Sequence, residues 1–139
     1  KYMTKCNAEN TLSLHVLIAE DEDINAMVLG SFLRDAGHSS KRVKDGAQAV
    51  AELAKNKYDI AFMDMHMPVM NGIDATRTWR EQEAKESHIP IIALTANATK
   101  DDQQACLQAG MDDFMTKPIT PERLSSAIIK FSACKTQAL

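Results

Sequence analysis

Short apolar runs alternate along this chain with longer segments in which apolar residues recur at helical spacing. The clearest run extends from Ile60 to Met63, between polar residues, and leads directly into a carboxylate, Asp64. Its length and composition are typical of a strand that is buried on both faces. Four further strands are predicted. Two of them are apolar runs like this one, and the other two are shorter or more polar. In chain order, the predicted strands cover residues 14–19, 39–43, 60–63, 90–94 and 111–116.

Each predicted strand is followed by a segment with helical periodicity. The first of these segments carries Ile24, Met27, Val28 and Phe32 on one face, which we expect to be buried. Asp23 directly precedes the segment and is expected to cap this helix. By the same reasoning, the buried face of the second helix is expected to comprise Ala47, Val50, Ala51 and Ala54.

Helix starts and stops are marked by residues with known capping preferences. Thr99, with Asp102 three residues later, resembles a capping box and begins the fourth helix, which Gly110 ends. Thr120 at the N-cap and Pro121 at the first helical position begin the fifth helix. Its buried face is expected to comprise Leu124, Ala127, Ile128 and Phe131.

Strict alternation of five strands with five helices is typical of parallel strands joined by right-handed crossovers, with helices covering both faces of one sheet. The expected fold class is therefore α/β, a flavodoxin-like doubly wound (βα)5 domain whose five-stranded parallel sheet has the order 2-1-3-4-5. The length of 139 residues fits one such domain. We expect the domain to span residues 12–133, between a linker or tail at residues 1–11 and a C-terminal tail at residues 134–139.

The composition is that of an ordinary soluble protein, with 45% hydrophobic and 25% charged residues. The formal net charge of −3 argues against a nucleic-acid-binding surface. No apolar stretch is long enough to span a membrane and no signal-peptide pattern is present, so we expect no membrane contact and a cytoplasmic location. Because the first residue is Lys1 and not Met, we expect the chain to be an excised piece of a longer protein.

Charged and hydroxyl side chains follow four of the predicted strands at their carboxyl ends. Glu20 and Asp21 follow the first strand, Asp64 the third, Thr95 the fourth and Lys117 the fifth. The carboxyl ends of parallel strands meet at one edge of the sheet, which is where ligands bind in open α/β folds. We therefore expect three carboxylates, one hydroxyl and one ammonium group to share a site.

This set of side chains is suited to phosphoryl chemistry. Three carboxylates with a backbone carbonyl form an oxygen-only site that favours Mg²⁺ over zinc or copper. Lys117 can bind one phosphate oxygen, and Thr95 can donate a hydrogen bond to another. An Asp carboxylate can act as the nucleophile and form an aspartyl phosphate, in a reaction that depends mainly on positioning and charge neutralisation.

Across residues 14–131, the chain resembles the CheY-like receiver domains of response regulators in two-component signalling. The resemblance rests on four stretches, VLIAEDEDIN, MDMHMPVMNG, ALTANA and DDFMTKPI. It implies that Asp64 is the phosphoacceptor, that Asp21 binds Mg²⁺ directly and that Glu20 reaches the ion through water. It also implies a cis peptide bond before the proline of the last stretch, consistent with proline being the residue for which cis costs least.

The resemblance assigns roles to the surrounding residues as well. The backbone carbonyl of His66 would complete the protein ligands of the metal. The side chains of His66 and Asn97 would modulate the access of water to the acyl phosphate. Thr95 would be the switch hydroxyl, Lys117 the lysine that binds the phosphoryl group and Phe114 the rotating aromatic.

The function implied is that of a phosphorylatable switch. A phosphohistidine on a histidine kinase would transfer its phosphoryl group to Asp64, Thr95 would move inward, and Phe114 would follow, altering a partner-binding surface. The isolated domain would assist both the gain and the loss of the phosphoryl group. The Glu-Asp acid pair and the ALTANA stretch resemble the corresponding stretches in receivers of hybrid histidine kinases. We therefore expect the parent chain to be a hybrid histidine kinase. Such a kinase can be anchored in the inner membrane, and it relays the phosphoryl group to a histidine phosphotransfer protein.

Some alternatives stay open and others fit the residues less well. A stand-alone response regulator, a receiver-like interaction module that is not phosphorylated, and a homodimer all stay open. A haloacid-dehalogenase-type phosphatase would need a second Asp at the position of His66. A flavodoxin-like electron carrier would need a phosphate loop rich in glycine and hydroxyl groups, where this chain has Glu-Asp-Glu-Asp.

Overall fold

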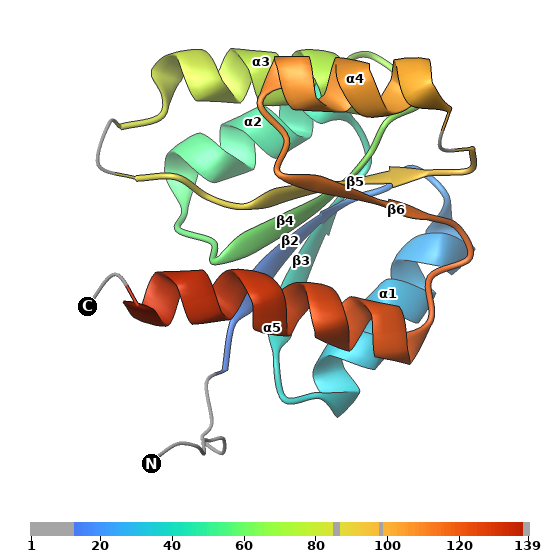
Figure 1. Cartoon of the computed structure of the whole chain (residues 1–139), viewed down its shortest axis with the longest axis vertical. Coiled ribbons are helices and arrows are strands. Elements are labelled where there is room, and N and C mark those ends of the chain that lie inside the picture. The colour runs from blue at the N-terminus through green and yellow to red at the C-terminus, as the bar shows by residue number, and fades with distance from the viewer. Residues whose placement is uncertain (1–12, 85–86, 98, 138–139) are drawn as a thin grey trace.

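The computed structural model of this chain describes residues 13–84, 87–97 and 99–137, with side chains described as far as Phe131. Strands and helices alternate along this part of the chain, as predicted (Figure 1). The predicted tail at residues 1–11 lies outside the described residues. The strands are β2 His15–Ala19, β3 Ser39–Val43, β4 Ile60–Asp64, β5 Ile91–Thr95 and β6 Asp113–Thr116, and the helices are α1 Asp23–Asp35, α2 Gly46–Lys55, α3 Gly72–Gln82, α4 Lys100–Ala109 and α5 Pro121–Gln137.

The five described strands form one parallel sheet in the order β3-β2-β4-β5-β6. Counted along the chain this order is 2-1-3-4-5, so the predicted fold class and strand order are confirmed. Ala19 lies opposite Val43 of β3 and Met63 of β4, and Asp64 lies opposite Leu94 of β5. This register brings the carboxyl ends of the central strands to the same edge of the sheet.

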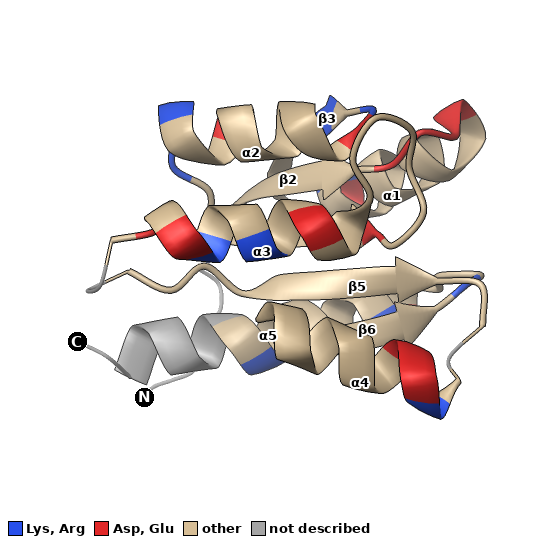
Figure 2. Ribbon diagram, turned by 90° about the horizontal axis from the view of Figure 1, so that it is seen from above, with Lys and Arg blue, Asp and Glu red and all other residues tan. Residues whose placement is uncertain are grey.

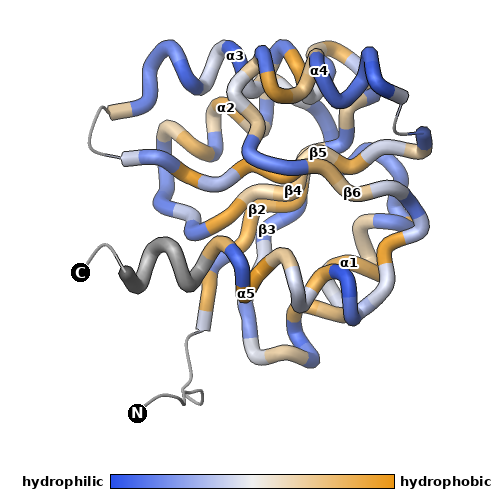
Figure 3. The backbone as a smooth tube through the Cα atoms, in the orientation of Figure 1, coloured by the Kyte–Doolittle hydropathy of each residue, from blue (hydrophilic) through white to orange (hydrophobic). Residues whose placement is uncertain are grey.

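Two hydrophobic cores lie on the two faces of the sheet. Helices α1 and α5 cover one face, and α2, α3 and α4 cover the other (Figure 1, Figure 2). Along β2, Val16 and Ile18 belong to the first core, and Leu17 and Ala19 belong to the second. Figure 3 shows β2 and β4 as hydrophobic over most of their length, whereas β3 at the edge is more polar. Burial on both faces explains why the central strands are readable as continuous apolar runs.

The predicted buried face of α1 is wrong for Ile24, Met27 and Val28, whereas Phe32 packs against the core as predicted. Ala26, Leu29 and Leu33 are buried against the sheet, whereas Ile24 and Met27 are 70% and 66% exposed. Both stripes have helical spacing, because apolar residues occupy more than half of the helix circumference, and periodicity alone cannot choose between them. The same correction applies to α2, whose buried residues are Gly46, Ala49 and Leu53, while Ala47, Ala51 and Ala54 are exposed and Val50 is half-buried.

Most helix ends follow the predicted signals. Thr99 accepts a hydrogen bond from the backbone N–H of Asp102, and Gly110 ends α4 in the left-handed conformation with φ 106°. The predicted capping role of Asp23 is wrong, because α1 begins at Asp23 itself. The residue in the N-cap position is Glu22, and its side chain makes no capping hydrogen bond. Asp23 is therefore available to another partner.

Helix α5 has the predicted buried face. Leu124, Ala127 and Ile128 lie in the core, and Phe131 packs against it. The helix continues to Gln137, past the predicted end of the domain, and the domain boundaries stay a prediction. Within the described residues, every helix is too short or too polar to cross a membrane.

Candidate active site

Glu20, Asp64 and Lys117 meet at the carboxyl edge of the sheet. Lys117 Nζ lies 2.9 Å from Glu20 Oε1 and 2.9 Å from Asp64 Oδ2. The other oxygen of Asp64, Oδ1, accepts a hydrogen bond from the backbone N–H of His66 at 3.0 Å. The peptide bond between Lys117 and Pro118 is cis, as predicted. The Asp64 carboxylate is therefore held through both of its oxygens in one orientation.

Glu20, Asp21 and Asp64 form an acidic cluster. One carboxylate oxygen of each residue lies within 4.8 Å of the other two. The donors are all oxygen atoms, and two of the three residues, Glu20 and Asp64, are buried. The ammonium group of Lys117 pairs with two of these carboxylates, Glu20 and Asp64, so the three acids together carry more negative charge than Lys117 neutralises. The cluster fits a hard divalent cation such as Mg²⁺, which these three residues would hold.

Two pKa shifts follow from this concentration of charge. Burial and the neighbouring Asp64 carboxylate raise the pKa of Glu20 to about 7, against the opposing effect of Lys117. Burial alone would lower the pKa of Lys117, but its contacts with Asp64 and Glu20 outweigh burial and raise it. Lys117 is therefore a cation at neutral pH. At neutral pH, Glu20 is therefore close to its titration midpoint unless a further positive charge is bound nearby.

The acidic residues that follow β2 have different partners. Glu20 Oε2 accepts a hydrogen bond from the backbone N–H of Glu22 at 3.2 Å. Asp23 pairs with Arg42 of β3, whose Nη2 lies 2.9 Å from Asp23 Oδ1. Arg42, and to a lesser degree Lys44, lowers the pKa of Asp23. Sequence reasoning misses Arg42, because only the pairing of β3 with β2 brings this side chain to the acidic loop.

Other acidic side chains lie at the same end of the molecule for a different reason. Asp74 is in the first turn of α3, and Asp101 and Asp102 are in the first turn of α4. Figure 2 shows the starts of these helices at the edge where the strands end. Negative charge near a helix N-terminus is stabilised by the helix dipole. Asp74, Asp101 and Asp102 are not part of the cluster formed by Glu20, Asp21 and Asp64.

The loop that follows Asp64 is fixed by close backbone packing. A Cβ added to Gly72 would collide with the carbonyl oxygen of Asp64. The Gly72 N–H donates to the carbonyl of Met65 at 3.2 Å. Val69, in the same loop, has a φ of 67°, in the left-handed region that β-branched residues rarely adopt. The loop is therefore held tightly at Gly72 and strained at Val69.

Thr95 ends β5, the strand beside β4, and Phe114 lies on β6, the next strand of the sheet. Thr95 is buried, and its Oγ1 donates to the carbonyl of Asn97 at 2.9 Å and accepts from the Asn97 N–H at 3.1 Å. The Lys117 N–H donates to the Thr95 carbonyl at 2.8 Å, which joins the ends of β5 and β6. Phe114 is half-buried against the core on the α4 side. The side chains of His66 and Asn97 are exposed.

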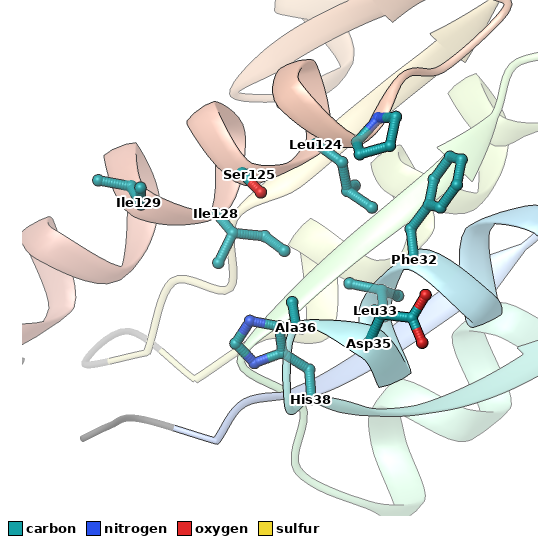
Figure 4. Close-up of a pocket in the computed structure, with 10 residues that line it drawn as sticks. Phe32, Leu33, Asp35, Ala36, His38, Leu124, Ser125, Ile128 and Ile129 are labelled. Atoms are coloured by element: carbon teal, nitrogen blue, oxygen red, sulfur yellow. The ribbon is translucent and has the colours of Figure 1, made fainter. Parts of the chain in front are cut away.

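A groove of about 380 Å³ lies between the end of α1 and α5 (Figure 4). Phe32, Leu124 and Ile128 provide much of its apolar wall, and His38 contributes a ring. His38 Nδ1 accepts a hydrogen bond from the backbone N–H of Leu14 at 3.0 Å, and burial lowers the pKa of His38. The residues that line this groove are all distinct from those of the acidic cluster. The groove is therefore separate from the site at Asp64.

Comparison with known proteins identifies a family and sequence relatives that match most of this chain. The family model described as response regulator receiver domain matches residues 16–129. Hybrid signal transduction histidine kinase I of Dictyostelium discoideum is 43% identical over 126 residues, which is 86% of this chain. The chain spans 7% of the length of that relative.

Two solved structures resemble the chain over most of its length. One is the receiver domain of a sensor histidine kinase from Pseudomonas aeruginosa, with a magnesium ion in its active-site cleft. It has a TM-score of 0.79 and 39% identity, over 86% of this chain and 98% of that chain. The other pairs a histidine phosphotransfer protein of Saccharomyces cerevisiae with the receiver domain of its downstream response regulator. It has a TM-score of 0.82 and 34% identity, over 91% of this chain and 92% of that chain.

Proposed function

This chain belongs to the response regulator receiver domain family, and on that premise we propose that it is the phosphoacceptor domain of a two-component phosphorelay. Asp64 takes a phosphoryl group from a phosphohistidine, and the domain then switches a partner-binding surface. The observation that carries the proposal is the ammonium group of Lys117 between Glu20 and Asp64. A buried, oriented carboxylate beside a cation and further acids is suited to phosphoryl transfer.

Asp64 acts as the nucleophile. One carboxylate oxygen attacks phosphorus, and the bond from phosphorus to the donor histidine nitrogen breaks. The bonding electrons stay on that nitrogen, which leaves as neutral imidazole when the other ring nitrogen carries a proton. Lys117 and the N–H of His66 hold the Asp64 carboxylate in one orientation, so the carboxylate needs little reorganisation before it attacks. Glu20, Asp21 and Asp64, with the His66 carbonyl as a further ligand, would hold Mg²⁺, which would supply positive charge for the phosphoryl oxygens.

Thr95 and Phe114 convert this local event into a change of surface. The Thr95 hydroxyl exchanges its hydrogen bonds with the backbone of Asn97 for one with a phosphoryl oxygen. Phe114, half-buried on the neighbouring strand β6, moves into the space that Thr95 leaves, and the surface of α4 and β6 changes. The exposed side chains of His66 and Asn97 control the access of water and hence the rate at which the phosphoryl group is lost.

The phosphohistidine donor docks over α1. Ile24, Met27 and Val28 are exposed on this helix, and Val69 is 84% exposed on the loop that follows Asp64. Groups of exposed large apolar side chains mark protein interaction sites. A solved relative is a receiver in complex with a histidine phosphotransfer protein, and we infer the same class of partner, together with a histidine kinase, for this domain.

The parent chain is a hybrid histidine kinase. A relative with 43% identity carries that description, and the chain spans a small part of its length. The receiver occupies residues 12–133 and works in the cytoplasm, where ATP-dependent kinases form phosphohistidine. The parent can be anchored in the inner membrane.

Intact mass spectrometry after incubation with acetyl phosphate tests the proposal. We expect one phosphoryl adduct that requires Mg²⁺ and is labile to hydroxylamine. Asp64→Asn should abolish the adduct, whereas Asp74→Asn, which alters an exposed acid in the first turn of α3, should retain it. The alternative of an interaction module that is not phosphorylated would be favoured by two results together, no adduct from acetyl phosphate or a phosphohistidine protein, and no binding of beryllofluoride with Mg²⁺.

A further inference from the structure

The backbone of Glu20 is held on both sides by β3. Its N–H donates to the carbonyl of Val43 at 3.1 Å. Its carbonyl accepts a hydrogen bond from the Nε–H of Arg42 at 2.8 Å. The second bond has a charged donor, which makes it stronger than a bond between neutral groups. The peptide group that joins Glu20 to Asp21 is therefore oriented by the side chain of Arg42.

The same guanidinium holds the far end of the acidic loop. Arg42 Nη2 lies 2.9 Å from Asp23 Oδ1, and the side chain of Arg42 is 25% exposed. Asp21 lies between the two residues that Arg42 contacts, Glu20 through its backbone carbonyl and Asp23 through a side chain that is 77% exposed. The ion pair also gives Asp23 a partner of its own, outside the cluster formed by Glu20, Asp21 and Asp64.

We propose that Arg42 is a positioning residue for the Mg²⁺ site, acting through Glu20 and Asp21. This inference rests on the proposed function, because it concerns the site at which Asp64 is phosphorylated. The planar guanidinium lets Nε donate to the Glu20 carbonyl while Nη2 forms an ion pair with Asp23, a fixed geometry that a lysine ammonium cannot reproduce. Mutating a residue that orients a metal ligand through a hydrogen bond typically weakens metal affinity by roughly 10-fold to 100-fold.

Charge and position predict opposite effects for this residue. A nearby cation repels Mg²⁺, so an Arg42 that acted only through its charge would weaken binding, and its removal would strengthen it. If Arg42 instead holds the loop in place, it strengthens Mg²⁺ binding. Removing Arg42 would then weaken Mg²⁺ binding, even though the site would become more negative. Arg42→Lys keeps the charge and loses the planar fork, and Arg42→Gln loses both.

Calorimetric titration of the unphosphorylated chain with MgCl₂ separates these effects. We expect the Kd for Mg²⁺ to rise about 10-fold in Arg42→Lys and in Arg42→Gln. The thermal midpoint in EDTA should stay close to that of the unaltered protein. The rate of phosphorylation by acetyl phosphate should recover at saturating Mg²⁺. Arg77→Gln is the matched control, because Arg77 pairs with Asp74 at 3.1 Å on the exposed side of α3, and its Kd should be unchanged.

Each other outcome counts against the proposal. An unchanged or lower Kd in either Arg42 variant would overturn the positioning role while leaving the phosphoacceptor function in place. A thermal midpoint that falls with the affinity in both variants would assign the effect to loss of the fold and would also overturn it. Failure of the unaltered protein to bind Mg²⁺ would overturn the proposed function itself, and this inference with it.

Discussion

Lys117 and Asp64 are 53 positions apart in the sequence, yet the ammonium nitrogen of one lies 2.9 Å from a carboxylate oxygen of the other. The contact forms because β4 and β6, with β5 between them, end at the same edge of the sheet. The same ammonium also lies 2.9 Å from Glu20. One cation thus faces two buried carboxylates, and the edge carries more negative charge than its own residues neutralise.

Replacing Lys117 by Met keeps much of the side-chain volume and removes the charge. We expect phosphorylation of Asp64 by acetyl phosphate to slow about 100-fold, the typical effect of removing one preorganised donor. The rate of adduct formation at saturating Mg²⁺, followed by mass spectrometry, measures this change. Lys130→Met is the control, because Lys130 pairs with Asp113 on the exposed surface at 3.3 Å. A Lys117→Met protein that reacts as fast as the control would contradict the role given to Lys117.

The raised pKa of Glu20 makes stability depend on pH when no cation is bound. Between the ordinary value of 4.5 and about 7, the folded protein holds a proton that the unfolded chain releases, so stability falls as the pH rises through this interval. Glu20→Gln removes the titration. Its stability advantage over the unaltered protein should grow across the interval, by up to roughly 3 kcal/mol. Urea unfolding in EDTA measures the difference, and a difference that is constant with pH would refute the prediction.

The sheet and the acidic cluster could be predicted because each depends on local sequence. Strands buried on both faces appear as apolar runs, and the residue that ends each run identifies one component of the site. Glu20, Asp21, Asp64 and Lys117 could therefore be assigned to one edge before their distances were known. The structure brings these four together at that edge.

The rotation of the helices and the partners of the acidic loop could not be predicted in this way. In α1 the stripes through Met27 and Leu29 are both apolar at helical spacing, and contact with the sheet buries only the second. Arg42 reaches Glu20 and Asp23 across two paired strands, so its role depends on strand order and register. Such features follow from tertiary packing and have no local signal in the sequence.

Gly72 is required by the space around it, and Gly30 is not. A Cβ at position 72 would collide with the carbonyl oxygen of Asp64, whereas at position 30 the nearest atom is Ser40 Oγ at 3.7 Å. We expect Gly72→Ala to lower the free energy of unfolding by more than about 2 kcal/mol, because backbone must move. Gly30→Ala, inside α1, should raise it by up to about 1 kcal/mol. Urea unfolding of both variants measures the contrast, and equal effects would contradict it.

Val69 provides a test of backbone strain. Its φ of 67° is unfavourable for a β-branched residue, and its side chain is 84% exposed, so little packing is lost on replacement. Val69→Asn should raise the free energy of unfolding by about 1 kcal/mol, because Asn tolerates this conformation. Val69→Thr keeps the branching while adding a polar group, and it should leave stability unchanged. A gain in Val69→Thr as large as that in Val69→Asn would show that polarity, and not relief of strain, is responsible.

Met27 separates docking of the donor from the chemistry at Asp64. Its side chain is 66% exposed on α1, so a charge there should leave the fold intact while opposing an apolar contact with a partner. We expect Met27→Glu to slow transfer from a phosphorylated histidine phosphotransfer protein at least about 10-fold, through the loss of roughly 1.4 kcal/mol or more of contact energy. Phosphorylation by acetyl phosphate should be unchanged, because this small donor needs no protein surface. Leu107→Glu makes the same kind of change at a residue that is 59% exposed on α4. If Leu107→Glu slowed transfer from the protein donor as much as Met27→Glu does, docking over α1 would be wrong. If Met27→Glu slowed both donors equally, the effect would lie in the site and not in recognition.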